Sequence, residues 1–162
     1  MKTNLKIVTL LVALSLLLAV PAFSFLSPVE TIQSYFSSVS NGDYIAAAKL
    51  FKYPKYSSDA EYNNDIQTVS NDLKDLVSDF GIAESLNQTN AVDGSYAGFG
   101  VSAGSPEHVE KYPPQNVVHM QVTFSKIGRG YISFLFNNAD GDDELIMVFY
   151  SIPRDVADKL EI

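Results

Sequence analysis

Three segments in the C-terminal part of the chain have the apolar patterns of β-strands. The first, Asn116–Phe124, alternates between a drier side with Val118, Met120, Val122 and Phe124 and a wetter side with Val117, His119, Gln121 and Thr123. A period of two is typical of a strand with one buried face. Tyr131–Phe136 is short and aromatic, and Glu144–Ile152 is apolar on both sides, which indicates a central strand. The glycine-containing loops between them are short, so the pattern predicts an antiparallel meander.

The preceding part of the chain follows a helical period. Ser27-Pro28-Val29-Glu30 is a capping box, and it begins a helix whose predicted buried stripe is Val29, Ile32, Tyr35, Phe36 and Val39. Asp43 is placed to cap a second helix, Tyr44–Lys52. A second capping box, Ser58-Asp59-Ala60-Glu61, begins a third helix that runs to about Phe80 and ends at Gly81.

Two weaker strands, Ile82–Gln88 and Ser95–Ser102, lie between the helices and the meander. Ala103–Gln115 is predicted to be a long loop, and Arg154–Ile162 a short polar helix or a tail. Helices followed by an antiparallel sheet define the α+β class. We therefore expect three N-terminal helices packed on a curved antiparallel sheet of about five strands.

The first residues resemble an export signal. Met1–Ser24 has Lys2 and Lys6 at its start and an apolar run, Ile7–Val20, shorter than the roughly 20 residues of a membrane-spanning helix. We predict a signal peptide over residues 1–24, which is cut before Phe25 or, as a second choice, before Phe23. Residues 25–162 then form a single domain in the periplasm or outside the cell. The alternative is an uncleaved anchor. The chain has no cysteine, which excludes disulfides and a lipid anchor on cysteine.

The charge of the chain limits its partners. The formal net charge is −8 at pH 7, and loss of Lys2 and Lys6 with the leader makes the remaining domain more acidic still. Such a domain repels nucleic acid and anionic lipid surfaces. We therefore expect no nucleic-acid partner and no stable membrane anchor after cleavage.

The segment Pro28–Phe51 resembles the opening of the nuclear transport factor two-like superfamily. The resemblance rests on an amphipathic helix, an Asn41-Gly42-Asp43 corner and an alanine-rich second helix that ends in Leu50-Phe51. It implies a cystatin-like, cone-shaped α+β roll, in which the sheet curls around the helices and leaves a pocket at its open end. Members of the superfamily include isomerases, dehydratases, hydrolases, protein-binding modules and secreted domains of unknown role.

In such a roll, aromatic and other large side chains would form the pocket wall. The candidates are Tyr35, Phe36, Phe51, Tyr62, Phe99, Met120, Phe124 and Phe134. The simpler interpretation is that they fill the core, because aromatic residues at core spacing need no further explanation.

Enzymes similar to this fold use an acid or a histidine in the pocket as a general base, which requires a desolvated carboxylate or imidazole. Three residues are weak catalytic candidates: Asp43, Tyr35 and His119. Asp43 is better explained as a helix cap and Tyr35 as packing. His119 lies on the wetter strand face and suits a surface or a dimer interface. No pair of acids falls on the dry face, so the pattern assigns no catalytic residue.

No segment predicts a metal or a cofactor. Glu107-His108-Val109-Glu110 has poor spacing for zinc, and Asn138–Asp143 lacks the first and last ligands of a calcium loop. The acidic face of the third helix carries Asp59, Asp65, Asp72, Asp75 and Asp79. A solvated surface explains it better than a cation-binding stripe. Asn87-Gln88-Thr89 is a glycosylation sequon, which has meaning only in a eukaryotic secretory route.

The sequence therefore favours an exported, non-catalytic binding or accessory domain that takes a small apolar ligand or a protein partner. Two alternatives stay open. One is a small-molecule isomerase or hydrolase that uses a pocket acid or base. The other is a homodimer through the outer sheet face, which would require Val117, His119, Tyr131 and Leu135 to be exposed together.

Overall fold

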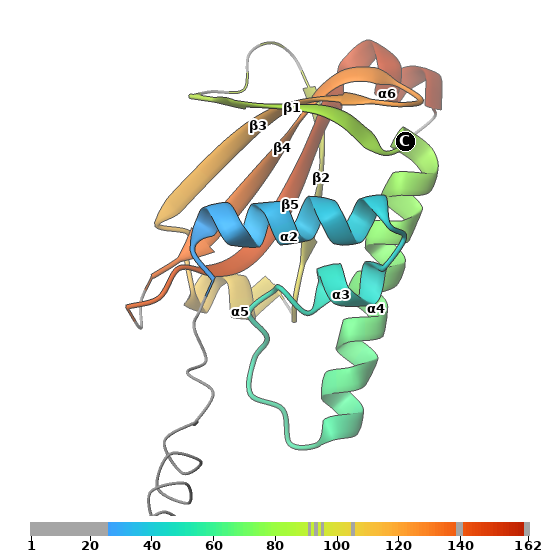
Figure 1. The fold of residues 1–162 in the computed structure, drawn as a ribbon. Helices are drawn as coiled ribbons and strands as arrows, with labels where there is room; N and C mark the ends of the chain where they lie inside the picture. Colours follow the sequence, from blue (N-terminus) through green and yellow to red (C-terminus); the bar gives the residue numbers. More distant parts are fainter. Residues whose placement is uncertain are drawn as a thin grey trace, which may run out of the picture.

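The computed structural model describes residues 26–90, 92, 94, 96–104, 106–138 and 141–160, with the backbone alone at 106 and 107. The predicted leader lies outside these ranges. Within them the chain is an α+β fold with one five-stranded antiparallel sheet and five helices (Figure 1). The helices are α2 (Pro28–Ser40), α3 (Tyr44–Ala48), α4 (Asp59–Phe80), α5 (Pro106–Lys111) and α6 (Arg154–Leu160). The strands are β1 (Ala83–Thr89), β2 (Tyr96–Ser102), β3 (Asn116–Phe124), β4 (Gly128–Asn137) and β5 (Glu144–Pro153).

The strand order in the sheet is β1-β3-β4-β5-β2, with every neighbouring pair antiparallel. The predicted meander is confirmed as β3-β4-β5 at the centre of the sheet. The two strands that precede it in the chain flank it, β1 beside β3 and β2 beside β5. Both edges of the sheet are therefore formed by its weaker strands, and the edge at β1 becomes one wall of the candidate site.

Three predictions about individual elements were wrong. The second helix ends at Ala48 rather than Lys52, because Lys52 donates its backbone N–H to Leu145 O at 2.7 Å and thereby joins the sheet. The segment predicted as a long loop contains α5. Glu61 does not complete the second capping box, since its carboxylate accepts hydrogen bonds from the backbone and hydroxyl of Ser57. The first capping box, between Ser27 and Glu30, forms as predicted.

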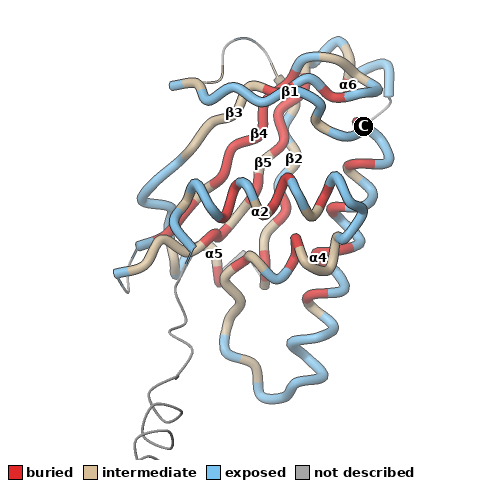
Figure 2. The backbone as a smooth tube through the Cα atoms, viewed as in Figure 1, coloured by how far each residue is buried: buried red, intermediate tan, exposed pale blue. Residues whose placement is uncertain are grey.

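The drier faces predicted for the strands line the core. Figure 2 shows buried residues concentrated on β4, β5 and the side of α2 that faces the sheet. The core side chains of the meander include Val122, Phe124, Ile132, Phe134, Phe136, Val148, Tyr150 and Ile152. From the helices, Tyr35, Phe36, Leu73 and Phe80 join them. One position of the predicted α2 stripe departs from this pattern, because Val29 is 61% exposed.

The opposite sheet face is less open than the sequence predicts. Val117 is 43% exposed and Leu135 is half-buried, but Tyr131 is only 2% exposed. The Tyr131 ring packs edge-on against Tyr96 with centroids 5.1 Å apart, and Arg129 donates a hydrogen bond to its hydroxyl at 3.0 Å. The dimer alternative requires Tyr131 to be exposed together with Val117, His119 and Leu135, and Tyr131 does not meet this requirement.

A buried pair of tyrosines connects α2 to the central sheet. The hydroxyls of Tyr35 and Tyr150 lie 2.6 Å apart, so one donates a hydrogen bond to the other. The Tyr35 ring packs edge-on against Phe134 at 5.2 Å, and Tyr150 stacks on Phe124 at 5.9 Å. Burial raises the pKa of Tyr35 well above its ordinary value and raises the pKa of Tyr150 to about 12.

We predict that Tyr35→Phe lowers the free energy of unfolding by about 1–3 kcal/mol, because it removes the hydroxyl partner of the buried Tyr150. The double variant Tyr35→Phe/Tyr150→Phe should lose clearly less than the sum of the two single variants. Urea unfolding of all four proteins measures this coupling. Additive losses would mean that the two hydroxyls do not stabilise each other.

The same pair gives a pH dependence. In the unfolded chain each phenol ionises near its ordinary pKa of 10.0, whereas in the fold the pKa of Tyr150 is about 12. The fold therefore favours the protonated form, and this stability is complete below pH 10 and declines as the pH rises towards 12. The wild type should accordingly lose more stability than the double phenylalanine variant over that range.

Candidate functional site

An apolar cleft lies between α2 and the β1–β3 edge of the sheet. Its volume is about 350 Å³, within the usual range for small-molecule pockets. The lining residues are Val29, Ile32, Gln33 and Phe36 from α2, Leu86 and Gln88 from β1, and Val118 and Met120 from β3.

The periodicities of the helix and the strands place these side chains together. The four residues of α2 have the spacing i, i+3, i+4, i+7, which puts them on one helix face. On the sheet, Gln88 pairs with Met120 and Leu86 with Val122, so the inward side of β1 continues the inward side of β3. The cleft is the place where these two apolar surfaces face each other.

The cleft opens at the start of α2. Ile32 and Phe36 are 7% and 8% exposed, whereas Val29 is 61% and Leu86 41% exposed. The floor is therefore continuous with the core, and the rim presents apolar side chains to solvent. Exposed apolar groups gathered around a hollow are typical of a binding surface.

Among the described residues, the lining has no ionisable group. Six of the residues have hydrocarbon or thioether side chains, and the other two, Gln33 and Gln88, carry neutral amides. Both glutamines are exposed, and neither side chain has a hydrogen-bond partner among the described residues. The cleft can therefore bind apolar groups and form hydrogen bonds at its rim, but none of its described lining residues is an acid, a base or a nucleophile.

The structure brings two of the eight predicted pocket residues, Phe36 and Met120, to this cleft. Four others, Tyr35, Phe51, Phe124 and Phe134, are buried in the core. Phe99 packs against Phe80 with ring centroids 5.5 Å apart. Tyr62 is 37% exposed and belongs to a tyrosine cluster with Tyr53 and Tyr56 on another part of the surface.

The three weak catalytic candidates do not share a site. Asp43 caps α3, where its Oδ1 accepts a hydrogen bond from Ala46 N at 2.9 Å. Tyr35 is enclosed in the core with Tyr150. His119 faces away from the core, with its Nδ1 2.7 Å from the hydroxyl oxygen of Ser133. None of the three lines the cleft.

The metal candidates are engaged in structural contacts. His108 is 8% exposed, and its Nε2 lies 3.2 Å from Lys52 O. In the hairpin, Asn138 Nδ2 donates to Asp143 Oδ1 at 3.2 Å, and residues 139 and 140 lie outside the described ranges. In the part of the chain that the structure describes, no three histidine, aspartate or glutamate side chains are grouped to hold a metal ion.

A larger and more polar hollow of about 470 Å³ lies between α4 and the segment before it. Its carboxylates already have partners. Asp65 accepts hydrogen bonds from the Tyr56 hydroxyl and from Gly104 N, and Glu61 accepts from Ser57. The carboxylates of this hollow are therefore engaged in contacts within the fold.

Sequence reasoning did not assign Val29, Ile32, Gln33, Leu86, Gln88 or Val118 to a pocket. One feature of the sequence could have indicated this cleft. Leu86 is the single large apolar residue in the strand AESLNQT, which is otherwise polar or small. An isolated leucine on the inward side of an edge strand indicates a local apolar neighbour, which is here the start of α2.

No protein-family model matches the chain, and neither the curated proteins nor the solved structures contain a match. None of the described helices has both the length and the apolar character needed to cross a membrane.

We predict that the rim of the cleft contributes little to folding. Val29→Ser and Leu86→Ser should each change the free energy of unfolding by no more than about 1 kcal/mol, because 61% of Val29 and 41% of Leu86 are exposed. Ile132→Ala, in the core, should cost about 2–5 kcal/mol. Urea unfolding compares the three variants, and a rim variant as costly as Ile132→Ala would show that the cleft is part of the core.

Proposed function

We propose that this chain is an exported, non-catalytic domain that binds a small apolar molecule in the cleft between α2 and the β1–β3 edge. The observation that carries the proposal is an open hollow of about 350 Å³ lined by apolar side chains and two neutral amides. A binding pocket of this kind needs apolar walls and a few polar groups that orient the ligand. The alternative of an isomerase or hydrolase has less support, because none of the lining residues can act as a general acid or base.

The proposal includes the fold family. Three observations support a cone-shaped roll of the nuclear transport factor two-like type: the order of helices before sheet, the central meander, and a hollow between the first described helix and the sheet edge. Such a roll would hold the three N-terminal helices on a curved sheet and open at the cleft. Export is proposed on the charge and apolar pattern of residues 1–24.

A nuclear magnetic resonance titration with 1-octanol tests the binding function on the chain from Phe25 to Ile162. We expect saturable shifts of backbone amides in the cleft segments of α2, β1 and β3, with a Kd of about 0.1–1 mM, as expected for a ligand of this size. Met120→Gln should weaken binding by at least about fivefold, because it replaces an apolar wall with an amide.

Met147→Gln is the matched control for this experiment, since it makes the same replacement at a half-buried position on the opposite sheet face. It should leave octanol binding unchanged. Absence of saturable shifts in the cleft, or equal effects of the two variants, would contradict the proposed binding site.

A second candidate function is a homodimer through the outer sheet face, which we define as the outward side chains of β3, β4 and β5. These are Val117, His119, Gln121, Thr123, Arg129, Tyr131, Ser133, Leu135, Met147, Phe149 and Ser151. None is a carboxylate, although the chain contains 19 acidic residues. Glu144, at the first residue of β5, is paired with Lys52. Two copies of an acidic protein could approach through this face with little like-charge repulsion.

The size of this face limits the dimer interface. With strands about 4.8 Å apart and about 3.3 Å per residue, its three strands span roughly 14 by 33 Å, or about 480 Å². A standard interface buries about 800 Å² of each partner, so the interface would be small, and Tyr131, Ser133 and Ser151 are already buried within the fold. The exposed apolar residues on this face, such as Val117 and the half-buried Leu135 and Met147, would form its centre.

Sedimentation equilibrium of the exported domain at about 50 µM protein tests this candidate. We expect a dimer for the wild type and a monomer for Leu135→Glu and for Met147→Glu, because each places like charges opposite each other in the interface. Val29→Glu, at an exposed position outside this face, is the control and should stay dimeric. A monomeric wild type would remove this candidate and leave the cleft proposal unaffected.

A further inference from the structure

The elements that form the cleft carry no cationic side chain. Neither α2 nor β1 nor β3 contains a lysine or an arginine, and the histidine of β3, His119, points to the outer face. Their only charged residues are two exposed glutamates, Glu30 and Glu84. The carboxylate of Glu30 accepts hydrogen bonds from the backbone and hydroxyl of Ser27.

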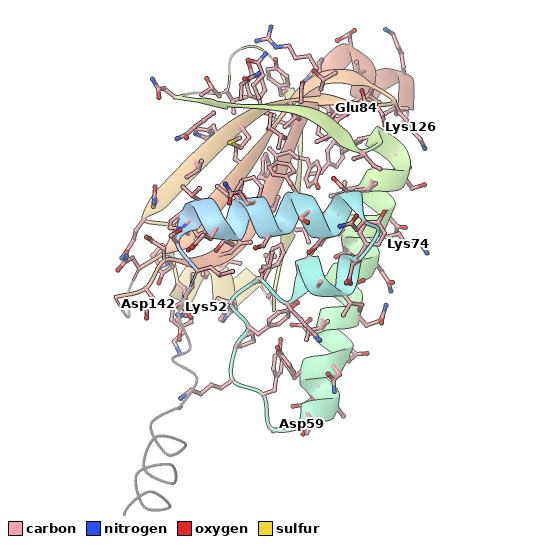
Figure 3. The ribbon with its side chains drawn as sticks, viewed as in Figure 1. Lys52, Asp59, Lys74, Glu84, Lys126 and Asp142 are labelled. Carbon is pink, nitrogen blue, oxygen red and sulfur yellow. The ribbon has the colours of Figure 1, made fainter. Side chains whose placement is uncertain are left out.

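The cations in the rest of the structure do not change this picture. Figure 3 shows Lys74 and Lys126 on or beside α4, and Lys126 donates to Ser78 O. Lys52 is paired with Glu144. None of the described lining residues is a cation, so an anion in the cleft would have no cationic partner there, in a protein whose net charge is −8. Moving an anionic group from water towards apolar walls without a cationic partner is unfavourable.

The two rim amides supply the remaining polar chemistry. Gln33 on α2 and Gln88 on β1 stand on opposite walls of the cleft, both without a hydrogen-bond partner among the described residues. Each amide can donate and accept. They therefore match a neutral ligand group that also donates and accepts, such as a hydroxyl or a carboxamide.

The volume limits the apolar part of the ligand. At roughly 30 Å³ for a water-sized group, about 350 Å³ holds on the order of a dozen non-hydrogen atoms. This corresponds to a single alkyl or short isoprenoid chain and is too small for a two-chain lipid.

We propose that the cleft selects an uncharged single-chain amphiphile with a hydroxyl or carboxamide end, and discriminates against the carboxylate of the same chain length. This inference rests on the proposed function, since it specifies the ligand class of the same cleft. The apolar chain lies between α2 and β3, and its neutral polar end lies at the rim between Gln33 and Gln88. The negative net charge of the protein and the missing cation disfavour a carboxylate or phosphate headgroup.

The test compares three ligands with eight carbons, 1-octanol, octanamide and octanoate, by the same resonance titration at pH 7. We expect octanol and octanamide to bind at least tenfold more tightly than octanoate. Octanoate binding as tight as octanol would overturn the selectivity but leave the apolar binding function standing. Failure of all three ligands to bind in the cleft would overturn both.

A variant that adds a cation at the rim of the cleft provides an independent test. Gln33→Lys supplies the missing cation at the rim and should tighten octanoate binding by at least about fivefold, whereas octanol, which loses the rim amide, should not bind more tightly. Gln67→Lys, at an exposed position on α4, makes the same change of net charge outside the cleft and should leave both affinities unchanged. If the two lysine variants affect octanoate equally, the discrimination reflects overall charge and the site assignment is wrong.

Discussion

The contact between α2 and the central strands is the constraint on which the cleft depends. The Tyr35–Tyr150 hydroxyl pair and the rings around it hold the middle of α2 on β5 inside the core. The start of the same helix lies opposite the edge strand β1, where Val29 and Leu86 remain largely exposed. At the other end of the helix Val39 is only 5% exposed, so α2 is buried towards its end and open at its first turns, where the hollow lies.

The parts of the fold that local patterns determine could be predicted from the sequence. Alternation in β3 and the apolar runs of β4 and β5 were enough for the meander, and Ser27 and Gly81 marked helix ends correctly. Contacts between segments distant in sequence decided the rest. The end of α3 depends on a hydrogen bond from Lys52 to Leu145, and the burial of Tyr131 depends on Tyr96 from an edge strand.

The candidate site was harder to predict because its side chains are ordinary core residue types. Phe36 and Met120 have the same apolar character as Phe134 and Phe124, and only the three-dimensional arrangement separates a wall of the cleft from the centre of the core. Periodicity identifies the inward side of an element but not whether another element covers it. Coverage depends on the angle and length of α2 relative to the sheet, which no local pattern encodes.

Each face of the sheet has a surface without carboxylates, although the protein as a whole is acidic. Acidic residues are concentrated on α4, which carries Asp59, Glu61, Asp65, Asp72, Asp75 and Asp79. At Asp72, partial burial and the neighbouring Asp75 raise the pKa of the carboxyl, so this helix already bears some cost of crowding acids. Both the cleft lining and the outer sheet face, by contrast, lack carboxylates. A uniform acidic surface would serve solubility alone, whereas this segregation keeps carboxylates away from both surfaces. Because apolar contact requires desolvation, and desolvating a carboxylate is costly, these are the surfaces on which the protein can bind another molecule without an opposing charge penalty.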